Sequence, residues 1–279
     1  MGKVAAIQMT SGHVVAANLA AAAELLRQAK DLGADVACLP ENFSFIGLKD
    51  ADKLAVAEDD GRGPVQDFLA TTARELKMWI LGGTTVLKGD SAARVANSSL
   101  LFDAAGRRVA RYDKIHLFDV TIPGRGERYL ESRHVTAGRD VVVADTPVGK
   151  LGLSVCYDMR FPELYRDLVD QGAQWLVMPA AFTVPTGRAH WETLLRARAI
   201  ENLCYVVAPA QAGTHSSGRE TYGDTLIVDY WGQVLSRLPK GSGVVAADID
   251  LDEQADTRAR FPALENRRLG KLPASRGPA

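Results

Sequence analysis

The sequence predicts a layered α/β fold in which strands and helices alternate along one chain. Of its 279 residues, 47% are hydrophobic, so the chain can bury a substantial core. Short apolar runs alternate with helix-forming segments in both halves, and antiparallel hairpins stand between them. The middle of the chain has no linker, and no repeat recurs at a fixed period. These observations favour a layered α/β architecture.

The first half supplies strands and helices in turn. Strands are predicted at residues 4–9, 35–41, 79–87, 96–103 and 106–117. A helix is predicted over 16–34, which is rich in strong helix formers and reaches a capping Gly33, and another over 64–77, with Pro64 in its first turn. Residues 118–140 follow with no clear period. Aperiodic loops of that length in compact domains are often functional.

The second half continues the alternation. Strands are predicted at residues 141–147, 150–156, 175–182, 204–213, 225–238 (a hairpin) and 243–251, and helices at 162–173 and 188–203. Residues 1–265 are therefore expected to form a single domain. The remaining residues, 266–279, are basic and rich in Pro and Gly, so we expect a flexible tail or one that lies across a partner subunit.

Composition excludes several classes of partner. Lys+Arg number 33 and Asp+Glu 34, so no basic excess indicates nucleic acid or an anionic membrane. No apolar run of about 18 residues predicts a membrane span. The three cysteines are too few and too far apart for a disulfide framework or a zinc site, which favours reduced thiols and a cytoplasmic location.

Cys156 is the first candidate for chemistry. It stands at the C-terminal end of the predicted strand 150–156, and Pro162 opens a helix a few residues later. A sharp turn between them would direct backbone N–H groups into a crevice, where they could stabilise a thiolate and an oxyanion. The alternative is an inert core thiol, since free cysteines are often buried. For Cys38 and Cys204, which lie inside apolar runs, we favour that alternative.

Three charged residues could join Cys156. Glu41 follows the second predicted strand, and a partly apolar pocket would suit it for proton transfer; the alternative is a solvated loop carboxylate. Lys114 lies in an apolar run, so its ammonium either reaches solvent or provides a fixed charge for an oxyanion. Glu131 lies in the long loop and alone carries almost no signal.

Other chemistries find less support. The five histidines have no metal-ligand spacing, and neither a glycine-rich dinucleotide motif nor a phosphate-binding lysine loop is present, so we expect no metal and no cofactor. A Cys–His dyad that uses His116 or His190 remains an alternative to a Cys–Glu–Lys arrangement.

Three motifs in order, "LPENF", "YDKIHLFD" and "GLSVCYDMRFPELYR", resemble those of the nitrilase superfamily of carbon–nitrogen hydrolases. The resemblance covers nearly the whole chain and makes residues 1–265 a single carbon–nitrogen hydrolase domain. It implies a four-layer α-β-β-α sandwich, usually paired into dimers. It also implies that Glu41, Lys114 and Cys156 are catalytic and that Glu131, rather than Glu127, is the supporting second glutamate.

The motifs "HLFDVTIPG" and "GRAHWETLLRARAIE" resemble the Nit branch, and "AIENLCYVVAPAQAG" resembles its deaminated glutathione amidases. The implied reaction hydrolyses a keto-acid amide through a cysteine thioester and yields 2-oxoglutarate and Cys-Gly. The candidates for substrate binding are Tyr157, Arg160, Thr183, Thr186, Arg188 and Arg219. The alternatives are ω-amidase activity on 2-oxoglutaramate and a non-catalytic dimeric binding module, which should lack one of the Glu, Lys and Cys residues.

Overall fold

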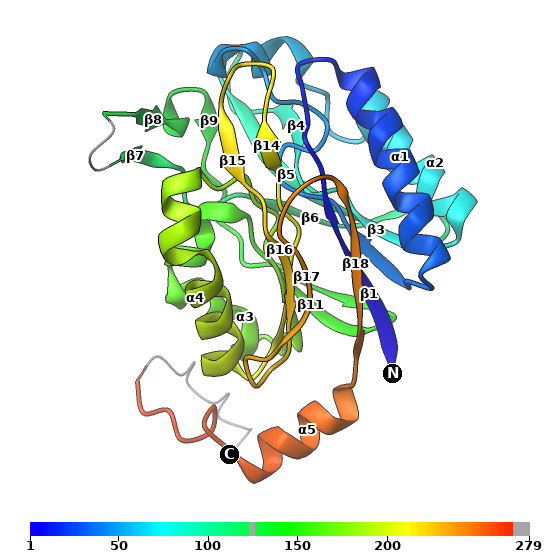
Figure 1. Cartoon of the computed structure of the whole chain (residues 1–279), viewed down its shortest axis with the longest axis vertical. Helices are drawn as coiled ribbons and strands as arrows, with labels where there is room; N and C mark the ends of the chain where they lie inside the picture. Colours follow the sequence, from blue (N-terminus) through cyan, green and yellow to red (C-terminus); the bar gives the residue numbers. More distant parts are fainter. Residues whose placement is uncertain (123–125, 270–279) are drawn as a thin grey trace, which may run out of the picture.

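Two β-sheets lie face to face in the computed structural model, which describes residues 1–122 and 126–269 (Figure 1). The first sheet has the order β18-β1-β2-β3-β5-β4, and β6 and β9 also pair with β5. Its strands are β1 (Gly2–Gln8), β2 (Val36–Cys38), β3 (Trp79–Leu81), β4 (Thr85–Lys88), β5 (Val95–Phe102), β6 (Arg108–Asp113), β9 (Val135–Thr136) and β18 (Gly243–Ile249).

The second sheet has the order β10-β11-β12-β13-β16-β17. Its strands are β10 (Val143–Thr146), β11 (Gly149–Leu153), β12 (Trp175–Val177), β13 (Tyr205–Ala208), β16 (Thr225–Val228) and β17 (Val234–Leu238). Strands β11, β12 and β13 are parallel, and parallel neighbours need crossover connections. Helices α3 (Pro162–Asp170) and α4 (Val184–Asn202) make these connections on the outer face of the sheet.

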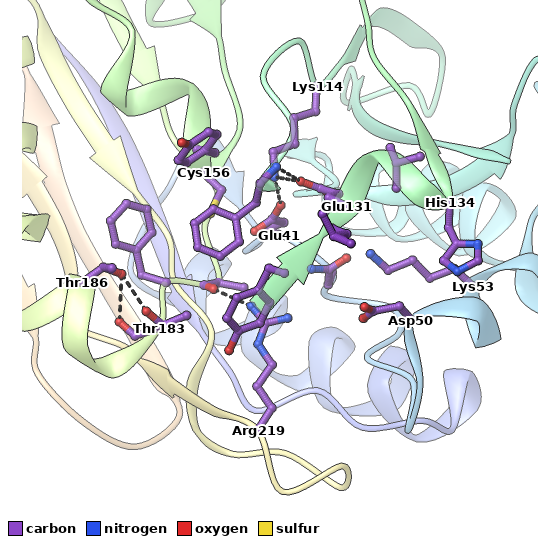
Figure 2. A pocket seen from close by; sticks show the side chains of 18 of the residues that line it. Glu41, Asp50, Lys53, Lys114, Glu131, His134, Cys156, Thr183, Thr186 and Arg219 are labelled. Atoms are coloured by element: carbon purple, nitrogen blue, oxygen red, sulfur yellow. Dashed lines mark hydrogen bonds and ion pairs between the residues drawn. The ribbon is translucent and has the colours of Figure 1, made fainter. Parts of the chain in front are cut away.

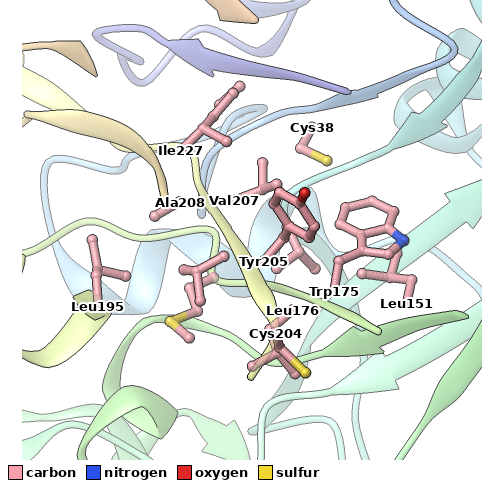
Figure 3. Close-up of a cluster of buried hydrophobic side chains, with 14 of the residues drawn as sticks. Cys38, Leu151, Trp175, Leu176, Leu195, Cys204, Tyr205, Val207, Ala208 and Ile227 are labelled. Atoms are coloured by element: carbon pink, nitrogen blue, oxygen red, sulfur yellow. The ribbon is translucent and has the colours of Figure 1, made fainter. Parts of the chain in front are cut away.

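Side-chain alternation along the strands creates four layers. In β1, Val4 and Ala6 join the core between the two sheets, whereas Ala5 and Ile7 join a second core beneath α1 (Val15–Asp31) and α2 (Pro64–Leu76). Because successive strand residues point to opposite faces, a strand with both faces buried must be apolar throughout. The predicted α-β-β-α sandwich is confirmed. Figure 3 shows part of the core around the second sheet, including Trp175.

The predicted loop 118–140 contains regular structure. Strands β7 (Asp119–Thr121) and β8 (Arg128–Leu130) form an antiparallel hairpin that projects from the body of the molecule (Figure 1). The alternating pattern of these strands is too short for a periodicity argument, since each has only three residues. A second short hairpin, β14 (Ala212–Thr214) with β15 (Glu220–Tyr222), was likewise not predicted.

Two further boundaries differ from the sequence predictions. The predicted strand 79–87 is divided into β3 and β4 at Gly82 and Gly83, and Gly83 has a left-handed backbone with φ 42°. Helix α5 (Leu251–Arg260) follows the last strand and was missed, because only Gln254 of its residues is buried and no apolar stripe marks it. Asp250 caps this helix by accepting hydrogen bonds from the N–H groups of Asp252 and Glu253.

None of the helices in the described ranges combines the length and the apolar character needed to cross a membrane. Of the tail predicted to be flexible, residues 270–279 lie outside the described residues.

Candidate active site

Four candidate residues from separate parts of the chain meet in one cleft (Figure 2). Glu41 follows β2, Lys114 follows β6 and Glu131 begins the 3-10 helix η2 (Glu131–Arg133) after β8. Cys156 begins the 3-10 helix η3 (Cys156–Arg160) after β11. Because three of these segments leave the ends of strands β2, β6 and β11, the two sheets fix the positions of the side chains at the mouth of the sandwich.

The Lys114 ammonium lies between two carboxylates. Its Nζ atom is 3.0 Å from Glu41 Oε1 and 2.8 Å from Glu131 Oε2. The Lys114 side chain is 2% exposed and that of Glu41 is 4% exposed. Both charged groups are therefore buried, and each requires the other as a counter-ion. Asn97 from β5 donates its amide to both carboxylates, at 3.2 Å to Glu41 and 3.4 Å to Glu131.

Cys156 occupies a sharp turn between β11 and η3. Its φ is 49°, in the left-handed region that residues other than glycine rarely adopt. Its N–H donates to the Pro179 carbonyl at 2.9 Å, which holds this backbone conformation in place. The thiol shares a hydrogen bond with the Glu41 carboxylate and accepts one from the Ala181 N–H. The turn thereby directs the sulfur into the cleft and toward Glu41.

Asp158 connects the Cys156 turn to the segment that carries Lys114. Its carboxylate accepts hydrogen bonds from Tyr112 Oη at 2.6 Å, from the Val155 N–H at 2.8 Å and from the His116 N–H at 2.9 Å. His116 Nδ1 lies 2.7 Å from the same carboxylate. The Asp158 side chain is fully buried. These contacts use both carboxylate oxygens of Asp158 and fix the start of η3 against the segment that follows β6.

The pKa values follow from burial and from these charges. Burial, followed by the negative charge of Glu41, raises the pKa of the Cys156 thiol well above its usual value, and Lys114 only partly opposes them. Burial alone would raise the pKa of Glu131, but the Lys114 ammonium and the Phe118 N–H lower it to about 2. Burial alone would lower the pKa of Lys114, but the carboxylates of Glu131 and Glu41 raise it well above the usual range. The resting thiol is therefore protonated.

The lowered pKa of Glu131 predicts a stability change in acid. Its ordinary value is 4.5 and its value in the folded chain is about 2. Ionised Glu131 therefore stabilises the fold fully above pH 4.5, and this contribution disappears as the pH falls toward 2. Chemical denaturation of the wild type and of Glu131→Gln should give unfolding free energies whose difference shrinks across that window. A difference that stays constant would contradict the ion pair.

The candidates for substrate binding divide into two groups. Five of them line the cleft: Tyr157, Arg160, Thr183, Thr186 and Arg219. The Oγ1 atoms of Thr183 and Thr186 are 2.8 Å apart. Arg188 does not line the cleft; its side chain is exposed in the second turn of α4.

The Cζ atom of Arg160 lies 5.8 Å from the Tyr157 ring centroid and 5.5 Å from that of Phe182.

The two histidines considered for a Cys–His dyad have other contacts. His116 binds Asp158 and stacks on Phe161, and His190 lies 3.3 Å from Arg160. Among the described residues, the hydrogen-bond partners of the thiol are Glu41 and Ala181.

Sequence reasoning missed several residues of this cleft. Asn97 was read only as part of an apolar strand, although a buried amide among apolar residues is itself a signal. Asn42, Lys53 and His134 also line the cleft. These residues and the four candidates line one concave site, which is the usual form of a small-molecule site.

The fold and the arrangement of the cleft define a class of protein. Residues 3–259 match the Carbon-nitrogen hydrolase family, and the chain belongs to this family. It is similar to a protein of Synechocystis sp. named deaminated glutathione amidase, with 44% identity over 271 residues that cover 94% of this chain and 97% of that protein.

Two solved structures share the fold. The Caenorhabditis elegans NitFhit protein superposes with a TM-score of 0.88 and 40% identity, over 96% of this chain and 65% of that one, so this chain corresponds to only part of NitFhit. Saccharomyces cerevisiae Nit3, described as a member of branch 10 of the nitrilase superfamily, superposes with a TM-score of 0.85 and 28% identity over 96% of this chain and 97% of that one. The predicted membership of the nitrilase superfamily is confirmed.

Proposed function

We propose that this chain hydrolyses the amide bond of a small keto-acid amide, with deaminated glutathione as the substrate. The observation that carries the proposal is the Lys114 ammonium, 3.0 Å from Glu41 and 2.8 Å from Glu131, in the same cleft as the Cys156 thiol. A nucleophile, a base and a fixed positive charge are the groups that acyl transfer from an amide requires. The name of the Synechocystis relative supports the choice of substrate.

The first half-reaction forms a thioester. Glu41 takes the proton of the Cys156 thiol as the sulfur attacks the amide carbonyl carbon. The oxyanion that develops is stabilised by the Lys114 ammonium and by the Tyr157 backbone N–H at the start of η3. When the C–N bond breaks, protonated Glu41 gives its proton to the departing amine, and the acyl group stays on sulfur.

The second half-reaction consumes one water. Glu41 removes a proton from water, and the resulting hydroxide attacks the thioester carbonyl. The same two donors stabilise the second oxyanion, and the C–S bond then breaks to release the carboxylic acid and regenerate the thiol. Glu131 keeps Lys114 in position through its 2.8 Å ion pair. These steps use the chain's own residues, and the proposal includes neither a metal nor an organic cofactor.

A substrate panel tests this function. Purified enzyme is given deaminated glutathione, 2-oxoglutaramate, an aliphatic ω-amide and an N-carbamoyl amino acid, and the released acid is measured. We expect the highest kcat/KM for deaminated glutathione. A higher kcat/KM for 2-oxoglutaramate would replace the proposal with an ω-amidase. No turnover of any compound would favour a non-catalytic binding module.

We also propose that the chain forms a homodimer through the face that carries α4 and α5. Ile200, Trp231 and Phe261 are large apolar residues that are 49%, 58% and 52% exposed on this face. The rings of Trp231 and Phe261 are 5.5 Å apart, and Gly232 adjoins the Ile200 side chain. Exposed apolar residues that cluster in this way are typical of protein interfaces.

The mass of the protein in solution tests the dimer. We expect light scattering to give about twice the chain mass of 30.1 kDa for the wild type. Trp231→Asp should shift the mass toward that of one chain while leaving the circular dichroism spectrum unchanged. A wild type with the mass of one chain would contradict the proposal.

Two further proposals concern the chain as a whole. Residues 1–265 act as one catalytic domain, and 266–279 form its tail. The protein works in the cytoplasm, a proposal supported by its three free thiols, since disulfides are rare there. Fluorescence microscopy of a tagged chain in its host tests the location.

A further inference from the structure

A second cavity opens from the cleft and extends it toward solvent. It is larger than the cleft that holds Cys156. The residues that line both spaces are Asn42, Asp50, Lys53, Tyr129, Thr183 and Arg219. We call the second space the outer cavity and this set its boundary. Because the boundary residues line both spaces, a molecule held at Cys156 can extend into the outer cavity.

Two polar atoms at the boundary lack hydrogen-bond partners among the described residues. One is Nε of Arg219 and the other is Oδ1 of Asn42, and both atoms are buried. The Asn42 residue is 7% exposed. Buried polar atoms are nearly always satisfied in folded proteins, so orphans of opposite kind, one donor and one acceptor, indicate a missing ligand. The ligand must therefore supply an acceptor to Arg219 and an N–H to Asn42.

The Arg219 guanidinium is held in place by a backbone carbonyl and an aromatic ring. Its Nη2 donates to the Ala181 carbonyl at 2.9 Å, and its Cζ lies 5.5 Å from the Tyr129 ring centroid (Figure 2). No carboxylate of the described residues lies within ion-pair distance of Arg219 or of the neighbouring Lys53. An arginine that is already fixed by a carbonyl and a ring, and that forms no ion pair with the described residues, is well placed to bind the carboxylate of a ligand.

The acidic residues around the outer cavity limit where an anion can bind. Asp50, Glu127 and Glu220 line it, and Glu127 accepts a hydrogen bond from Tyr129 Oη at 3.0 Å. They repel a carboxylate from their own positions. The cations of the wall are Lys49, Lys53 and Arg219, and of these Arg219 has a buried nitrogen without a partner among the described residues.

The proton transfer from Glu41 to the departing amine indicates which part of the substrate enters the outer cavity. Glu41 protonates the departing amine, so the amine must lie beside Glu41, and Asn42 is the next residue along the chain. Arg160 lies beyond Cys156 on η3, on the side of Phe182 and Thr186. The leaving amine therefore points across Asn42 toward the outer cavity, and the acyl group lies toward Arg160. Ala181 donates its N–H to the thiol and accepts from Arg219, which ties the two positions together.

We propose that the outer cavity is a subsite for the leaving group of the substrate, a further step that rests on the proposed function. Arg219 binds a carboxylate on the leaving amine, and Asn42 accepts an N–H from it. The substrate class is accordingly an amide whose amine is an amino acid or short peptide with a free C-terminal carboxylate. Amides that release only ammonia leave this subsite empty.

Arg219→Gln, measured on three substrates, tests the subsite. The substrates are deaminated glutathione, the same compound with its C-terminal carboxylate converted to an amide, and 2-oxoglutaramate. For deaminated glutathione we expect KM to rise about 10- to 100-fold, the effect of losing a charge-assisted hydrogen bond, with kcat changed less than about threefold. The other two substrates should show the same KM with wild type and variant. Arg74→Gln, on the exposed face of α2, is the matched control.

The possible outcomes separate the two proposals. If the wild type hydrolyses the keto-amides but Arg219→Gln changes KM equally for all three, Arg219 is only structural and the subsite proposal fails. The subsite also fails if the wild type uses the amidated compound as well as the free acid. If the wild type hydrolyses none of the compounds, the proposed function fails and the subsite fails with it. Arg219→Lys should recover part of the lost affinity.

Discussion

Replacing Cys156 by alanine should reduce amide hydrolysis to background, a loss of at least about 10⁴-fold in kcat. The sulfur is the atom on which the acyl group is carried, and no other described thiol lines the cleft. The fold should survive. Alanine and cysteine have the same Cβ, so the backbone at φ 49° is no more strained than before, and the lost sulfur leaves a small cavity that costs about 1 kcal/mol.

The rate at which the acid product is released measures the loss of activity, and thermal unfolding measures the change in stability. Cys204→Ala is the matched control, because Cys204 is also buried but lies in the core, where its thiol donates to the Ala173 carbonyl at 3.4 Å. It should keep its kcat. Cys156→Ser should fail like the alanine variant, since a hydroxyl is far less acidic than a thiol. Turnover by Cys156→Ala above background would rule out the covalent route.

Replacing Lys114 by methionine should have the second largest effect. It removes one donor to the oxyanion, which we expect to lower kcat by about 10²- to 10³-fold. It also leaves the carboxylates of Glu41 and Glu131 facing each other in a buried site without a counter-ion. Breaking a buried ion pair in this way costs about 3–5 kcal/mol of unfolding free energy.

A double variant distinguishes catalysis from folding. In Lys114→Met/Glu131→Gln, one of the two unpaired charges is gone, so part of the lost stability should return, whereas kcat should stay low. Denaturant titration gives the unfolding free energy, and steady-state kinetics give kcat. A double variant that regained activity with stability would mean that Lys114 is needed only for the fold.

Local patterns predicted a layered α/β fold and the candidate residues at strand ends, whereas the four-layer sandwich was implied by the resemblance to the nitrilase superfamily. Apolar runs marked the buried strands, and Glu41 and Cys156 follow such runs directly. Whether Lys114 pointed inward could not be decided locally. Its partners come from β2 and η2, which are distant in sequence, and only the pairing of the strands brings them to 3.0 and 2.8 Å.

Local patterns could not identify Glu131, which the resemblance implied, or the boundary residue Lys53. Glu131 is directed to Lys114 by the β7–β8 hairpin, whose three-residue strands leave no readable period. Lys53 belongs to the 3-10 helix η1 (Asp50–Val56), which has no buried residue and thus no apolar stripe. Arg188 failed as a cleft residue for a simpler reason: α4 begins at Val184, so Arg188 is already in its second turn and faces outward.

The protonated state of the Cys156 thiol affects how the protein withstands oxidative stress. Thiolates attack peroxides and simple alkylating agents, so the rate at which a cysteine is modified falls with its thiolate fraction. A sulfur kept neutral by burial and by the Glu41 carboxylate is therefore a poor target for hydrogen peroxide in the absence of substrate. In the proposed mechanism Glu41 takes the thiol proton as the sulfur attacks a bound carbonyl, so the reactive thiolate forms in the presence of substrate.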